Sequence, residues 1–94
     1  MDTPREIPAE ESLIEYPCDF TIKVMGAAIP EFRQKIMAIA SQHDTEFNEQ
    51  KVTEKFSKNN KYLSLSLTIA AQNRQQLDAL YTDLTACELT QWVL

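Results

Sequence analysis

Few side chains in this sequence are of the kinds that catalyse reactions or hold metals. His43 is the only histidine, and Cys18 and Cys87 are the only cysteines. Neither Cys-x-x-Cys nor His-x-x-x-His occurs, so the close ligand spacing of a zinc site is absent. A thiol nucleophile at Cys18 with His43 as its base is geometrically conceivable in the inferred fold. His43 has a simpler role at a helix end, where it favours the negative end of the dipole. We predict no catalytic residue, metal or cofactor, and a thiol enzyme stays a remote alternative.

Gly26 is the only glycine, and it lies where an extended hydrophobic run gives way to a helical pattern. Glycine permits a positive φ and a close backbone approach. The helix that follows begins with unpaired N–H groups, which suit an anion or a carboxylate. Met25, Gly26, Ala27 and Ala28 therefore form the predicted ligand-binding loop. The alternative is that Gly26 only lets the chain turn. If the loop binds a ligand, Gly26→Val should damage binding more than folding.

The hydrophobic periodicity predicts six elements that would position this loop. They are a strand around 20–25, a helix over 29–43, strands over 46–56 and 62–69, a helix opened by Asn73 and Gln76, and a strand over 89–94. The order β-α-β-β-α-β is the ferredoxin-like plan. We therefore predict an α+β fold with an antiparallel four-stranded sheet, order 4-1-3-2, and two helices on one face. The charged strand 46–56 falls at an edge, where lysines discourage unwanted pairing.

The other face of the predicted sheet is polar. Lys23, Ser64, Ser66 and Thr68 point outward from the two central strands by simple alternation. RNA-recognition domains of similar topology stack bases on outward aromatic side chains, and here only Tyr62 is available. This face is therefore predicted to make hydrogen bonds or contact a protein partner.

The charge is unevenly distributed along the chain. The net charge is −5, and residues 1–17 hold five acidic side chains against one arginine. The nearly neutral remainder argues against nucleic-acid binding, which relies on Lys and Arg at phosphates. Residues 1–12, with two prolines and an acidic cluster, are predicted to be a flexible segment, and 13–94 a single domain.

The sequence also indicates where in the cell the protein is expected. No apolar stretch has the roughly 18 residues of a membrane span, and the acidic beginning is unlike a signal peptide. We expect a cytoplasmic protein with reduced cysteines and no membrane partner.

Several segments resemble a known family. They are Leu13-Ile14-Glu15-Tyr16-Pro17, Phe20-Thr21-Ile22-Lys23-Val24-Met25-Gly26, Ser57-Lys58, Tyr62 to Ile69, Leu80-Tyr81 with Leu84, and Val93-Leu94. Through these segments, residues 13–94 resemble the YbeD-like family of small bacterial proteins. The fold of that family resembles the ACT domain, a regulatory module that binds amino acids or other small effectors, usually between two copies. The resemblance implies an ACT-like fold and a regulatory or binding role. Two places depart from it: Asn59-Asn60-Lys61 in the hairpin, and Trp92 where methionine is usual.

Two functions are therefore expected from the sequence. The first is a stand-alone, regulatory ACT-like domain that binds a small effector, such as an amino acid, at residues 25–28. The alternative is a protein-interaction module without a small ligand, which docks through the edge or the outward face of its sheet. In both cases a homo-oligomer is expected. Cys18 and Cys87, each predicted at the start of its strand, lie on the order of 20 Å apart. A disulfide needs Cα atoms within about 7 Å, so none is expected.

Overall fold

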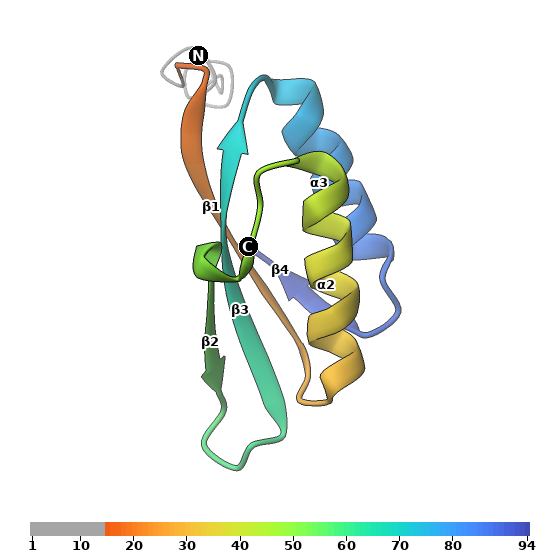
Figure 1. Ribbon diagram of the computed structural model, residues 1–94. Helices are drawn as coiled ribbons and strands as arrows, with labels where there is room; N and C mark the ends of the chain where they lie inside the picture. Colours follow the sequence, from red (N-terminus) through yellow and green to blue (C-terminus); the bar gives the residue numbers. More distant parts are fainter. Residues whose placement is uncertain (1–14) are drawn as a thin grey trace, which may run out of the picture.

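A computed structural model describes residues 15–94, which form one four-stranded sheet covered on one side by two helices (Figure 1). The elements are β1 (Cys18–Ala27), α2 (Pro30–His43), the 3₁₀ turn η1 (Glu49–Lys51), β2 (Val52–Phe56), β3 (Tyr62–Ala71), α3 (Arg74–Ala86) and β4 (Thr90–Val93). The sheet order is β2-β3-β1-β4, and every neighbouring pair is antiparallel. The predicted ferredoxin-like α+β fold is confirmed. The predicted acidic segment 1–12 lies outside the described residues.

The two central strands form the framework of the sheet. β1 and β3 pair over their full ten residues, from Cys18 opposite Ala71 to Ala27 opposite Tyr62. Alternate side chains face the helices and are buried: Ile22, Val24, Leu63, Leu65, Leu67 and Ile69. Burying a large aliphatic side chain contributes about 1.5–3 kcal/mol, so this alternation decides which face becomes the core.

Each helix covers the sheet with one apolar stripe. α2 buries Phe32, Ile36 and Ala40, and α3 buries Leu77, Leu80 and Leu84, at the three- and four-residue spacing of one helical face. α2 has Pro30 in its first turn, where the missing N–H has no helical partner to lose. At α3 the predicted cap is present, because the Asn73 side chain accepts a hydrogen bond from the Gln76 backbone at 2.8 Å.

A polar junction, which the sequence did not reveal, ties the end of α2 to β3 and α3. The Asp44 carboxylate is buried and accepts hydrogen bonds from the backbone N–H groups of Glu46 and Ala70, both at 3.0 Å. The Gln76 amide donates to the carbonyl groups of His43 at 2.7 Å and Ala70 at 3.1 Å. Since unpaired buried polar groups cost about 1–3 kcal/mol each, these bonds fix where the two helices lie on the sheet.

The edge strand is shorter than predicted. Only Val52–Phe56 of the predicted strand 46–56 is extended, because the Asn48 side chain accepts a hydrogen bond from Gln50 and opens η1 before it. In the hairpin after β2, Asn60 has a φ of 60°, a left-handed conformation that asparagine tolerates.

Gly26 lies within β1 and not in a loop, which corrects the prediction. Its φ is not positive, and the residue is buried. An added Cβ would overlap the carbonyl oxygen of Leu89 and lie 2.5 Å from Cε1 of Phe32. The pairing of β1 with β4 also shifts register between Met25 and Gly26. Glycine is required here because α2 and the segment before β4 pack against its Cα, so packing accounts for the residue without a positive φ, and ligand binding at residues 25–28 stays a prediction.

Gly26→Ala should therefore reduce folding stability, by about 1–3 kcal/mol of unfolding free energy. The Leu89 carbonyl belongs to the backbone and Phe32 is fully buried, so neither moves aside without disturbing the core. Urea denaturation followed by circular dichroism measures the change. Ala27→Ser, next to it in β1, is the matched control and should stay within about 0.5 kcal/mol. Equal stability of Gly26→Ala and the wild type would contradict this account.

Candidate functional site

The four residues of the predicted ligand loop do not form one site. Met25 lies on the open face of the sheet, where it lines two hollows, while Gly26 is buried on the helix side. Ala27 pairs with Tyr62 in the ladder of β1 and β3. Only Ala28 lines the small hollow at the start of α2. Met25, Gly26 and Ala27 continue β1, so their positions alternate between the two faces of the sheet. The sequence predicted a strand that ends near residue 25 and did not reveal this extension.

The predicted partner surface is brought together on the open face. Lys23 lies opposite Ser66 in the register of β1 and β3, Met25 lies opposite Ser64, and Thr68 lies two pairs beyond Ser66, opposite Thr21. Their side chains are exposed or half-buried, as outward positions require.

β4 adds an apolar cluster to this face that the sequence analysis missed. Trp92 lies opposite Met25, and the backbone of Leu94 exchanges two hydrogen bonds with Lys23, at 3.0 and 2.7 Å. Trp92 is 55% exposed, Leu94 is 71% exposed, and the Tyr62 ring meets Trp92 edge to face at 6.5 Å. We call Met25, Tyr62, Trp92 and Leu94 the Trp92 cluster. One signal was present in the sequence, since Trp92 and Leu94 alternate with Val93, which packs against the core.

Two adjoining hollows surround the cluster. The first has a volume of about 330 Å³ and is lined by Lys23, Met25, Trp92 and Leu94. The second, of about 260 Å³, is lined by Lys23, Met25, Lys55, Phe56, Ser57, Tyr62 and Ser64. Lys23 and Met25 line both, so the hollows form one concave surface across the sheet. Among the residues 15–94 that line it, none is acidic.

The lysines of this surface make no ion pair with an acidic side chain of residues 15–94. Lys23 and Lys55 line the hollows, and the Lys61 ammonium lies 5.8 Å from the centre of the Tyr62 ring. None of these three forms an ion pair with a carboxylate in residues 15–94. The open face therefore combines exposed aromatic surface with lysines that no acidic side chain of residues 15–94 pairs with.

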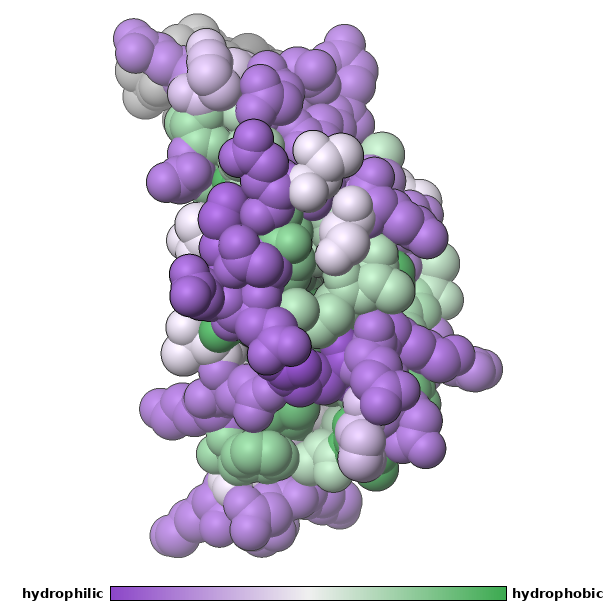
Figure 2. Space-filling view, viewed as in Figure 1, coloured by the Kyte–Doolittle hydropathy of each residue, from purple (hydrophilic) through white to green (hydrophobic). Residues whose placement is uncertain are grey.

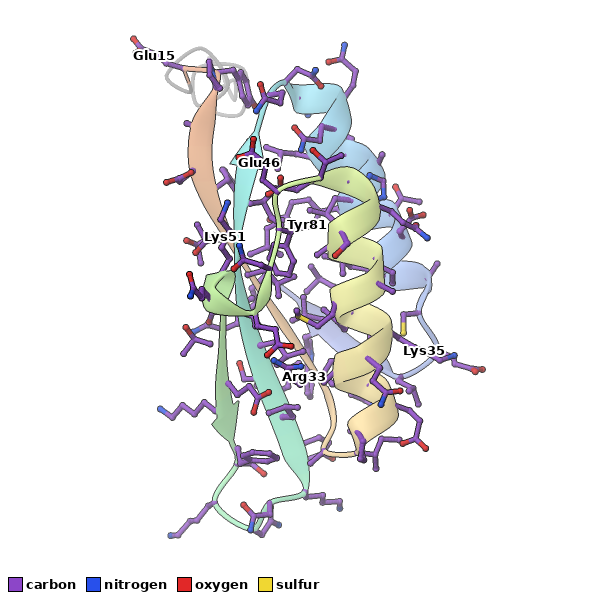
Figure 3. All side chains as sticks on the ribbon, in the orientation of Figure 1. Glu15, Arg33, Lys35, Glu46, Lys51 and Tyr81 are labelled. Carbon is purple, nitrogen blue, oxygen red and sulfur yellow. The ribbon has the colours of Figure 1, made fainter. Side chains whose placement is uncertain are left out.

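Apolar surface also appears near the hairpin end of β2. Figure 2 shows a hydrophobic patch there on a largely hydrophilic face. Phe56, the last residue of β2, is 50% exposed, and Ile29 is 40% exposed. Both line a hollow of about 220 Å³ with Ala28, Pro30 and Leu63. Arg33 reaches from α2 toward the sheet and pairs with Glu54 at this hollow (Figure 3).

The remaining reactive side chains are engaged elsewhere. His43 Nε2 lies 2.6 Å from Asp83 Oδ2, so the imidazole that was considered as a base for Cys18 is held by α3. Burial raises the pKa of Tyr81, which lies between α3 and the sheet in Figure 3. A fourth hollow, of about 570 Å³, runs between the helices, where it is lined by Lys35, Asp83, Cys87 and Glu88 among others. Within residues 15–94, no three His, Cys, Asp or Glu side chains are arranged to hold a metal ion.

The fold and the open face define a small α+β domain of the ferredoxin-like plan. Residues 11–94 match the family model described as "Protein of unknown function (DUF493)", and the chain belongs to this family. It is 46% identical to a UPF0250 protein of Leptothrix cholodnii, over 96% of this chain and 99% of the relative. It is 47% identical to a UPF0250 protein of Bordetella pertussis, over 94% of this chain and 97% of the relative. The YbeD-like resemblance to small bacterial proteins is thereby confirmed.

The family description and the names of these relatives state no activity. In the described part of the chain, no helix is long and apolar enough to cross a membrane. The expected cytoplasmic location stays a prediction.

The two cysteines are free and lie near opposite ends of β1. Cys18 begins β1, whereas Cys87 follows α3 and comes three residues before Thr90, which pairs with Gly26 at the far end. Cys87 therefore caps a helix and does not begin a strand as predicted. At roughly 3.3 Å per residue the two ends of β1 are more than about 20 Å apart, beyond the reach of a disulfide.

Mild oxidation with diamide should therefore leave no bond between Cys18 and Cys87 within one chain. Tryptic mapping under non-reducing conditions measures this, with Cys87→Ser as the control that removes the linked peptide if it exists. A peptide that joins both cysteines from a monomeric fraction would contradict the strand order.

Proposed function

We propose that this protein works by binding and not by catalysis, and that it docks a polypeptide partner on the open face of its sheet. The Trp92 cluster is the observation that carries the proposal. Trp and Tyr are enriched at the energetic centres of protein interfaces, and an exposed, concave apolar patch is a typical place for one. The surrounding Ser64, Ser66 and Lys23 supply the polar rim that such interfaces have.

The Trp92 side chain lies outside the buried core. The side chain adds little to the core, which is closed on the helix side by Ile22, Val24 and the leucines of β3. A half-exposed tryptophan keeps much of its surface in water, and a partner that covered it would gain the free energy of that burial. Removing it should therefore cost binding far more than stability.

The first test locates the partner and then measures its affinity. A photo-cross-linking amino acid at Ser66 captures whatever covers the open face in bacterial cells, and the same group at Gln34, exposed on α2, is the control. The captured protein is then purified and titrated by calorimetry. Trp92→Ala should weaken binding by about tenfold or more, as for an interface hot spot, while Gln34→Ala has no effect. Equal affinity of Trp92→Ala and wild type, or capture from Gln34 alone, would contradict the proposal.

A second copy of the chain is the competing occupant, because a homo-oligomer was expected from the sequence. A two-fold interface uses the same patch on both copies, so it would bring together two surfaces that each carry Lys23 and Lys55. This like-charge arrangement favours a different partner. Sedimentation velocity separates the two cases: a dimer that dissociates on Trp92→Ala would make a second copy the occupant and overturn the proposal.

A small effector at the start of α2 is the second candidate, favoured by the hollow beside Ala28. Its lining is mostly apolar, and Arg33 offers a guanidinium that a ligand carboxylate could take from Glu54. Its volume of about 220 Å³ is below the usual range for ligand pockets, which start near 300 Å³, so only a ligand of amino-acid size fits.

For this candidate, thermal unfolding is measured against the twenty amino acids and common carboxylic acids. A ligand that binds the native state at a hundredfold excess over its Kd adds about 2.7 kcal/mol of stability, which raises the Tm by several degrees. Arg33→Gln should abolish the rise in Tm. Lys35→Gln is the control and should leave the rise unchanged, because Lys35 lines the hollow between the helices and not the hollow beside Ala28. Unchanged melting curves with every compound would remove this candidate.

A further inference from the structure

We infer that the segment docked on the open face is acidic, with a large apolar side chain followed by carboxylates at a defined spacing. This inference rests on the proposed function and adds the chemistry of the partner to it. It is carried by the charge of the surface around the Trp92 cluster, where Lys23 and Lys55 line the hollows and no acidic side chain among residues 15–94 does.

The positive charge is local and does not follow from the composition. The whole chain has a net charge of −5. Glu54, the acidic residue of β2 that neighbours Lys55, is paired with Arg33 of α2 and lines the hollow beside Ala28. Asp83 and Glu88 line the hollow between the helices. These three acidic side chains thus lie away from the two hollows of the open face, and no acidic side chain among residues 15–94 lines either hollow, which leaves the lysines there available to a carboxylate.

The register gives the spacing. One row runs straight across the sheet, from Lys55 through Ser64 and Met25 to Trp92. The next row runs through Thr53, Ser66 and Lys23, and the backbone of Leu94 completes it. Neighbouring strands are about 4.8 Å apart, so Lys23 lies one strand from the apolar end of the surface and Lys55 lies about 14 Å from Trp92.

An extended segment that crosses the strands can satisfy both rows. At about 3.3 Å per residue, a chain with an apolar side chain in the hollow of Trp92 and Leu94 reaches Lys23 within one or two residues and Lys55 after about four. The hydroxyl groups of Ser64 and Ser66 lie between these points and can donate hydrogen bonds to carboxylates. The expected motif is an apolar residue followed by acidic residues one to four positions away.

A single-stranded nucleic acid is also an anion that stacks on aromatic rings, and it is disfavoured here. Its affinity depends on many phosphate contacts, whereas this surface offers Lys23, Lys55 and Lys61 on a chain of net negative charge. The hollow beside Lys23 is lined by Met25 and Leu94 as well as by Trp92, which suits an aliphatic or aromatic side chain of a peptide.

The test is a selection of random dodecapeptides displayed on phage. Clones that bind the wild-type protein are counter-selected on Trp92→Ala, so that only those using the Trp92 cluster remain. Their sequences should show an excess of Asp and Glu at one to four positions from an apolar residue. The most enriched peptide, labelled with fluorescein, is then titrated against variants and at rising salt concentration, because screening weakens exposed charge pairs.

Matched double variants isolate the lysines. Lys23→Gln with Lys55→Gln should weaken binding of that peptide by about tenfold. Lys35→Gln with Lys58→Gln removes the same charge from residues that line neither hollow and should leave affinity unchanged.

The outcomes separate this inference from the proposed function. Two outcomes would overturn the inference and leave the docking face in place. One is that the Trp92-dependent peptides are neutral or basic, and the other is that acidic peptides bind the Lys23→Gln, Lys55→Gln variant with unchanged affinity. Absence of any Trp92-dependent clone would overturn both. Displacement of the peptide by a single-stranded RNA dodecamer at lower concentration than by unlabelled peptide would overturn the inference in favour of a nucleic acid.

Discussion

The ten-residue pairing of β1 with β3 is the constraint on which the rest of the structure depends. Side chains of a strand alternate between its faces, so a single register makes Leu63, Leu65 and Leu67 the floor of the core. The same register places Lys23, Ser64 and Ser66 on the other side. A slip of one residue would exchange the two sets. The core and the candidate binding face are thus two consequences of one pairing.

The helices reinforce this choice from one side only. Phe32 of α2 packs so closely over β1 that Gly26 has no room for a Cβ, and the Leu89 carbonyl closes the same space. This contact brings the chain from α3 back to β1, where β4 begins with a shifted register. Trp92 lies opposite Met25, immediately beside this shift. Gly26 is therefore required by packing, and it lies next to the pair that places the exposed tryptophan on the open face.

The polar contacts divide into those that hold the fold and those left available. Asp44 and Gln76 satisfy backbone groups where α2, β3 and α3 meet. His43 and Arg33 pair with carboxylates of α3 and β2. By contrast, Lys23 and Lys55 have no ion-pair partner among residues 15–94. Side chains that the fold does not use lie together on the open face, which is why that face is the candidate for function.

The sequence by itself determined the elements, because periods of 2 and 3.6 residues and the signals at Pro30, Asn60 and Asn73 are local properties of the chain. From those elements followed the sheet order and the outward residues of β1 and β3. The tertiary structure decided what depends on contacts between distant segments. These are the packing at Gly26, the junction at Asp44, and the contacts of Trp92 with Met25 and Tyr62. Met25 and Tyr62 precede Trp92 by 67 and 30 residues in the sequence. A four-residue strand such as β4 carries too short a pattern to fix its register against β1, so only the part of the binding face that β1 and β3 provide was predicted from the sequence.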